Sequence, residues 1–135
     1  MAKLSKLKSD PDTINGQWHE YVPGVEVCVA KWANPRHKAA IERIALDRVE
    51  SGRPAVDVEA SLDDMRAAAE GVITGWRGLE NEDGTEMVFS IEKAIEVFSN
   101  PDYWEFFNFV KNKALTGHRA VKATEGNSSR SQSTR

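Results

Sequence analysis

The sequence predicts a single, mainly α-helical domain of about four helices with a small N-terminal β-hairpin. Valines alternate at a period of two just after a Pro-Gly pair near the N-terminus. Four later segments carry apolar residues at helical spacing, and Asn-Pro pairs or a serine precede three of them. At 135 residues, the chain has room for one compact domain.

The hairpin is predicted over residues 17–30. Pro23 and Gly24 suit the two central positions of a type II turn, since glycine tolerates the positive φ needed at the second. Valines at 25, 27 and 29 then alternate with other residues along the second strand. Two strands alone are marginally stable in water, so we expect the valine face to pack against helices.

The first helix is expected to begin at Asn34 and Pro35, a capping residue followed by a residue suited to the first helical position. Residues 51–54 are predicted to end it, because they contain glycine and proline. Its predicted inward stripe consists of Ile41, Ile44, Ala45 and Val49.

The second helix is predicted over residues 57–74. Its apolar stripe spans about 100° of arc and consists of Val58, Leu62, Met65, Ala69, Val72 and Ile73. Asp63 and Asp64 lie at or beyond the edge of this stripe. Adjacent residues point about 100° apart on a helix, so these two carboxylates are expected on a solvated face rather than in a catalytic pair.

Two further helices are predicted after a turn built around Asp83 and Gly84. Ser90 can cap a short helix whose apolar residues end at Phe98. Asn100 and Pro101 open the last helix, expected over residues 101–116. The domain is therefore predicted over residues 14–117, between a flexible segment 1–13 and a disordered polar tail 118–135.

Charge and composition exclude several classes of protein. The net charge is −3, but residues 9–116 carry 11 basic and 20 acidic residues between basic ends. Such a body repels nucleic acid, because cation contacts with phosphates dominate that binding. No apolar run is long enough for a membrane span, no secretory signal is apparent, and the single cysteine, Cys28, fits a cytosolic protein.

Catalytic, metal and cofactor motifs are not found in the sequence. His19, His37 and His118 have no paired motif around them, and Cys28 has no CxxC partner. The acidic turn before Gly84 resembles a calcium loop, but Ser90 stands where the bidentate acidic ligand would be. We therefore expect a binding protein rather than an enzyme, with no metal and no cofactor.

The last helix carries more apolar side chains than one buried face needs. Its main stripe consists of Tyr103, Phe106, Phe107, Val110 and Ala114. Trp104 and Leu115 fall to one side of this stripe and Phe109 to the other. Either the hairpin or N-terminal segment covers them, or they form a partner-binding surface.

Residues 72–90 resemble a segment of the tail assembly chaperones of long-tailed siphophages. The shared pattern is I-x-G-W-x-G followed by D-G-x-x-x-x-[FY]-[ST], matched here by Ile73, Gly75, Trp76, Gly78, Asp83, Gly84, Phe89 and Ser90. The order of hairpin and helices around it also fits, so the resemblance covers about residues 14–116. Trp76 is assigned either to the core or, with Trp104, Phe109 and Leu115, to a partner surface.

This resemblance implies a helical protein of the host cytoplasm that is absent from the finished virion. Its expected partners are the tape measure protein and the tail tube protein, with no nucleic acid and no membrane. Several copies on one tape measure chain, or a homo-oligomer, are compatible with its size. A longer form made by ribosomal frameshifting is common in the family.

Two alternative functions remain open from the sequence. One is a structural minor tail or head–tail connector protein that stays in the phage particle. The other is a small DNA-binding regulator, which would need a basic recognition helix. The helices here carry few cations beside many acids.

Overall fold

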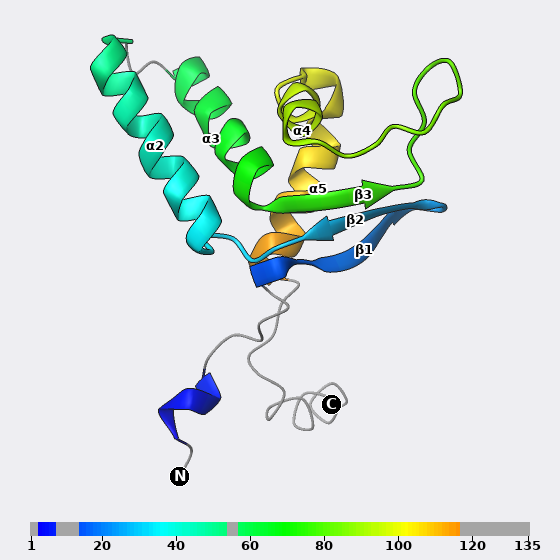
Figure 1. Cartoon of the computed structure of the whole chain (residues 1–135), viewed down its shortest axis with the longest axis horizontal. Coiled ribbons are helices and arrows are strands. Elements are labelled where there is room, and N and C mark those ends of the chain that lie inside the picture. Colours follow the sequence, from blue (N-terminus) through cyan, green and yellow to red (C-terminus); the bar gives the residue numbers. More distant parts are fainter. Residues whose placement is uncertain (1–2, 8–13, 54–56, 117–135) are drawn as a thin grey trace.

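The computed structural model describes residues 3–7, 14–53 and 57–116. It contains four α-helices and a three-stranded antiparallel sheet in one compact body, which confirms the predicted mainly helical fold (Figure 1). In chain order the elements are η1 (Leu4–Leu7), β1 (Gln17–Val22), β2 (Val25–Val29), α2 (Pro35–Ser51), α3 (Asp57–Gly71), β3 (Ile73–Arg77), α4 (Ile91–Phe98), η2 (Pro101–Tyr103) and α5 (Trp104–Thr116). The predicted polar tail, and the predicted flexible N-terminus apart from residues 3–7, lie outside the described residues.

The hairpin forms as predicted, with β2 in the middle of the sheet. The strand order is β1-β2-β3, and β1 pairs with β2 so that Trp18 lies opposite Cys28. Gly24 has a φ of 88°, as the second central position of a type II turn requires. On β2, Val27 and Val29 are fully buried. The valine face therefore does pack against the rest of the domain.

The third strand corrects the predicted second helix, which ends at Gly71 rather than at 74. Gly71 lies against the start of α2, where an added Cβ would come within 2.4 Å of the His37 Cα. The chain then turns into the sheet, and the Ala30 N–H donates to the Val72 carbonyl at 2.7 Å. β3 pairs with β2 and places Trp76 opposite Val27.

Helices α2 and α3 lie side by side at one end of the molecule (Figure 1). Asn34 caps α2 as predicted, because its side chain accepts hydrogen bonds from the N–H groups of Arg36 and His37. The predicted inward stripe of α2 is largely wrong. The buried residues are His37, Ala40 and Ile44, whereas the other members of that stripe, Ile41, Ala45 and Val49, are exposed.

Asp63 is also placed differently from the prediction of a solvated face. It is buried between α2 and α3 and forms an ion pair with Arg48 of α2. Arg66 approaches the same carboxylate at 3.0 Å. Asp64 is exposed, as predicted. The helix pair therefore meets partly through a charged contact, which explains why α2 turns fewer apolar residues inward.

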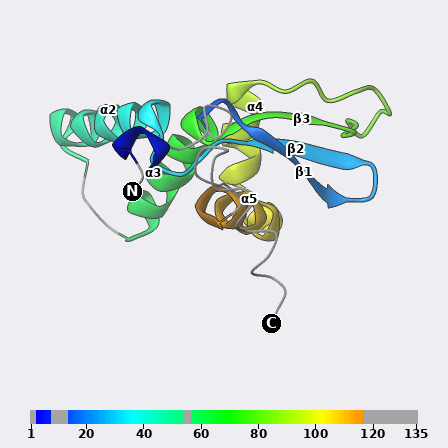
Figure 2. The same ribbon diagram turned by 90° about the horizontal axis from the view of Figure 1, so that it is seen from below.

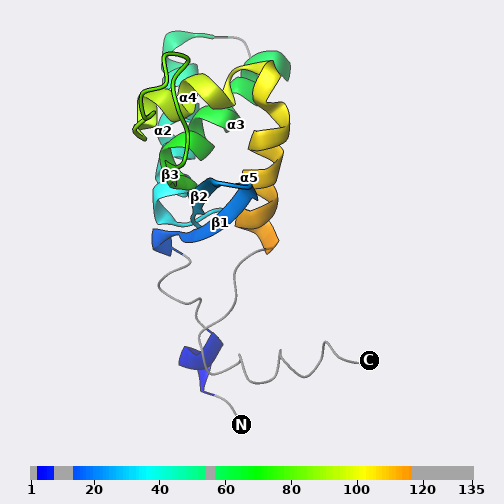
Figure 3. The same ribbon diagram turned by 90° about the vertical axis from the view of Figure 1, so that its right-hand side faces the viewer.

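The main core lies between the sheet and helices α3, α4 and α5. Figures 2 and 3 show α5 on one side of the sheet, where it packs against β2. Phe98 of α4 packs against the α5 residues Phe106 and Phe107, with ring centroids 6.0 and 5.1 Å away. Asn100 caps a short 3-10 turn, and α5 begins only at Trp104, so Tyr103 is half exposed instead of joining the buried stripe.

Candidate partner-binding groove

A groove of about 780 Å³ opens beside the start of α5. We call it the aromatic groove. One wall comes from the hairpin and the loop of residues 79–87, and the other from the end of α4, η2 and the first turn of α5. Its lining residues are Tyr21, Val22, Val25, Trp76, Leu79, Glu80, Glu82, Met87, Val97, Pro101, Asp102, Tyr103, Trp104, Glu105 and Phe106.

Trp76 fixes the loop wall of the aromatic groove. It lies on β3 with 6% of its surface exposed, and its indole Nε1–H donates to the Met87 carbonyl at 2.8 Å. Phe89 packs edge-on against the same indole, with centroids 5.0 Å apart. The Met87 N–H in turn donates to the Leu79 carbonyl at 2.9 Å. The two ends of the loop are therefore held together beside β3.

The tip of this loop is a tight turn, as the Asp83-Gly84 pair predicted. Gly84 has a φ of 89°, and its N–H donates to the Asn81 carbonyl at 2.9 Å. The Thr85 hydroxyl donates to Asp83 at 2.6 Å and the Thr85 N–H donates at 3.0 Å. These two bonds favour the ionised carboxylate and so lower the pKa of Asp83.

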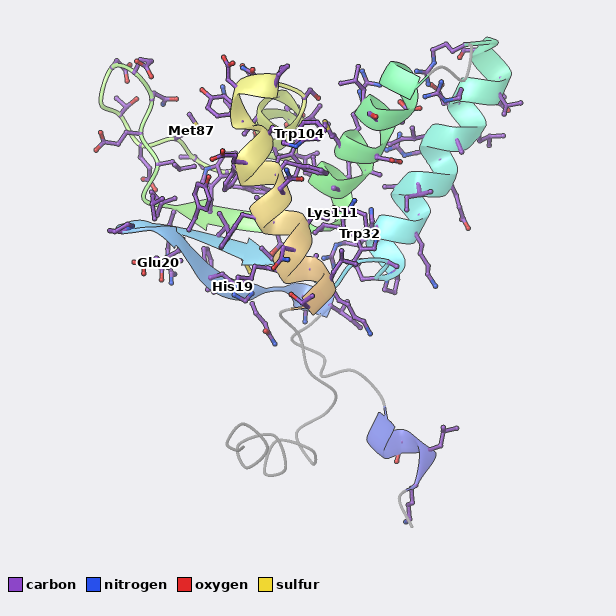
Figure 4. The ribbon with its side chains drawn as sticks, turned by 180° about the vertical axis from the view of Figure 1, so that it is seen from behind. His19, Glu20, Trp32, Met87, Trp104 and Lys111 are labelled. Atoms are coloured by element: carbon purple, nitrogen blue, oxygen red, sulfur yellow. The ribbon has the colours of Figure 1, made fainter. Side chains whose placement is uncertain are left out.

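Trp104 is the half-exposed tryptophan of the opposite wall. Its side chain is 49% exposed, and its nearest ring contact is with Phe107 at 6.3 Å between centroids. It also borders a second apolar hollow of about 300 Å³, which Leu62, Met65 and Phe98 help to line. Met87 and Trp104, labelled in Figure 4, thus belong to the two walls of the groove, and Trp104 and Pro101 line both the groove and the second hollow.

Among the described residues, every charged residue that lines the aromatic groove is acidic. Glu80 and Glu82 lie on the loop wall, Asp102 lies in η2, and Glu105 lies in the first turn of α5. All four are exposed. The groove therefore combines an aromatic interior with a negative rim.

The four partner-binding candidates from the sequence occupy different places. Trp104 and Leu115 are exposed, at 49% and 57%. Phe109 is half-buried against Tyr21, with centroids 4.9 Å apart. Trp76 lies in the core and reaches the groove from inside. Only Trp104 and Trp76 line the aromatic groove.

Sequence reasoning missed the groove residues of the hairpin and the loop. Tyr21 and Met87 lie far from the last helix in sequence, and neither belongs to a motif that marks a binding site. Assigning Tyr21 and Met87 to one site with Trp104 requires knowing that β3 brings the loop beside the start of α5.

Residues 3–7, 14–53 and 57–116 contain no group of three His, Cys, Asp or Glu side chains arranged to hold a metal ion. Burial lowers the pKa of His37, and the His37 Nδ1 accepts a hydrogen bond from the Ala33 N–H at 3.0 Å. None of the helices among these residues has the length and apolarity to cross a membrane.

Comparison with known proteins gives a match to a protein-family model. A family model described as YdaY prophage protein matches residues 33–127. The chain belongs to the YdaY prophage protein family. No curated protein and no solved structure matches the chain. The YdaY match confirms the phage origin that the resemblance predicted, and it covers α5 and the loop of residues 79–87 but not the hairpin residues of the aromatic groove.

Proposed function

We propose that this YdaY family protein is a phage tail assembly chaperone that binds the tape measure protein and recruits tail tube subunits. The observation that carries the proposal is the aromatic groove, with the half-exposed Trp104 standing at its edge. Exposed tryptophans beside a preformed apolar hollow are common anchors of protein interfaces. The phage family and the motif of residues 73–90 support the same role.

The mechanism is binding without a chemical step. Long apolar helices of a tape measure protein need cover until the tail tube encloses them. The aromatic groove would take large side chains from one face of such a helix, while the acidic exterior of the chaperone keeps the complex soluble. The protein would act in the host cytoplasm and leave before the virion is complete.

The test is co-expression with the tape measure protein of the same phage. We expect the wild-type chain to increase the soluble fraction of the tape measure protein and to co-purify with it. Trp104→Ala should abolish most of both effects. Trp18→Ala is the matched control, because Trp18 is similarly exposed, at 44% against 49%, but lies on β1 outside the aromatic groove.

Two results would overturn the proposal. One is full co-purification by the Trp104→Ala protein, since the groove would then not be the binding surface. The other is recovery of the chain from purified virions by mass spectrometry, which would favour a structural tail or connector protein instead.

A further inference from the structure

We propose that the aromatic groove selects a cationic amphipathic helix, whose apolar face carries large side chains and whose flanks carry lysine or arginine. This rests on the proposed function, because it specifies which segments of a tape measure protein the groove would take. The charge of the rim and the size of the aromatic groove support the inference, and neither observation depends on the family match.

The size of the groove sets the form of the ligand. A volume of about 780 Å³ resembles that of small-molecule pockets, roughly 300–1,000 Å³. An α-helix with its side chains is about 10–12 Å across, so the hollow receives the side chains of one face rather than a whole helix. Such recognition uses anchors spaced at i, i+3, i+4 and i+7. Trp76 and Phe106 are the buried aromatic surfaces that these anchors would meet.

The rim sets the charge of the ligand. Glu80 and Glu82 come from one wall and Asp102 and Glu105 from the other, so a helix lying between the walls would have carboxylates along both flanks. Among the described residues, no ion pair involves any of these four carboxylates. Cations on the ligand would be attracted to these carboxylates, and anions would be repelled by them.

A pair of synthetic helical peptides tests this selection. Both carry the same Leu and Phe face, and one has lysines at the flanking positions where the other has glutamates. Fluorescence anisotropy with the full-length protein should show at least about tenfold tighter binding of the lysine peptide at low salt. The preference should shrink as salt rises from about 50 to about 300 mM, because exposed charges are then screened.

Two double variants separate the groove rim from the overall charge. Glu80→Gln with Glu82→Gln should weaken binding of the lysine peptide by about threefold to tenfold. Glu42→Gln with Glu50→Gln makes the same change in net charge on exposed residues of α2, at the opposite end of the molecule from the loop (Figure 1). This control should leave binding nearly unchanged, whereas Trp104→Ala should weaken binding of both peptides.

Equal affinity for the two peptides, or equal loss in the two double variants, would overturn the inference. So would a concentration-dependent dimer that Trp104→Ala dissociates, since a second copy would then occupy the groove. Binding of tape measure fragments, measured in the same assay, distinguishes failure of the inference from failure of the proposed function. If they bind but no charge preference appears, only the inference fails, and if the lysine peptide binds while no tape measure fragment does, only the proposed function fails.

Discussion

The Trp76 indole N–H donates to the Met87 carbonyl at 2.8 Å and so attaches the loop wall of the aromatic groove to the core of the domain. The indole lies on β3, while Met87 is on the returning arm of the loop. A buried donor that reaches a backbone acceptor is costly to remove, because the acceptor then loses its partner. The shape of the groove therefore depends on a residue that contributes little exposed surface itself.

Trp76→Phe should lower the free energy of unfolding by about 1–3 kcal/mol, from the lost hydrogen bond and the smaller ring. Urea denaturation measures this cost, and amide hydrogen exchange in residues 79–87 should become faster. Trp32→Phe is the control, because the indole N–H of the half-buried Trp32 makes no hydrogen bond within the described residues. The prediction fails if exchange in the loop is unchanged.

The two glycines of the G-W-x-G motif should differ in their tolerance of alanine. Gly78 has a φ of 89°, and an added Cβ would lie 1.8 Å from the Gly24 carbonyl oxygen. At Gly75 an added Cβ would meet Trp18 at 3.6 Å, an ordinary contact. We expect Gly78→Ala to cost at least about 2 kcal/mol of stability and Gly75→Ala much less. Similar denaturation midpoints for the two variants would contradict this.

Asp63→Asn should destabilise the α2–α3 pair by about 2–3 kcal/mol, because it removes the buried carboxylate that pairs with the largely buried Arg48 guanidinium and with Arg66. Asp64→Asn changes the neighbouring exposed carboxylate in the same way and should cost less than about 0.5 kcal/mol. Thermal unfolding of the two proteins gives the comparison. An equal effect of both changes would mean that the buried ion pair contributes little.

Stability should fall as the pH falls below 6.5, the ordinary pKa of histidine. Burial lowers the pKa of His37 in the folded protein, and Asp64 only partly opposes this. Between the folded and unfolded pKa values the unfolded chain binds more protons, so acid favours unfolding. The contribution of the neutral His37 to the free energy of unfolding is complete above pH 6.5 and declines as the pH falls below that value. Urea unfolding between about pH 5 and pH 8 measures the slope.

His37→Gln tests whether His37 causes this pH dependence. The side-chain oxygen of the glutamine can still accept the hydrogen bond from the Ala33 N–H, but the glutamine does not titrate. The variant should unfold with a flatter pH dependence than the wild type. His19→Gln should flatten it as well, because burial and Lys113 lower the pKa of His19. An unchanged slope in both variants would assign the pH dependence to other groups.

Local signals in the sequence determined the hairpin, the starts of α2 and α4, and the 3-10 turn that precedes α5. Pro23-Gly24 needs only its own backbone preference to turn the chain, and Asn34, Ser90 and Asn100 cap through hydrogen bonds to N–H groups two or three residues ahead. The chemistry of these features lies within a few residues, so no knowledge of the rest of the fold was required. A phage origin was also predicted, from a motif within residues 73–90, although the YdaY family itself was not.

Tertiary structure alone decided the third strand, the buried face of α2 and the aromatic groove. Ile73 continues the apolar pattern of a helix, but the close approach of Gly71 to His37 ends α3 and the open edge of β2 takes the next residues as a strand. The exposure of Trp104 depends on which surfaces the hairpin and the loop cover. Each of these outcomes is set by contacts between segments distant in sequence, where periodicity within one segment carries no information.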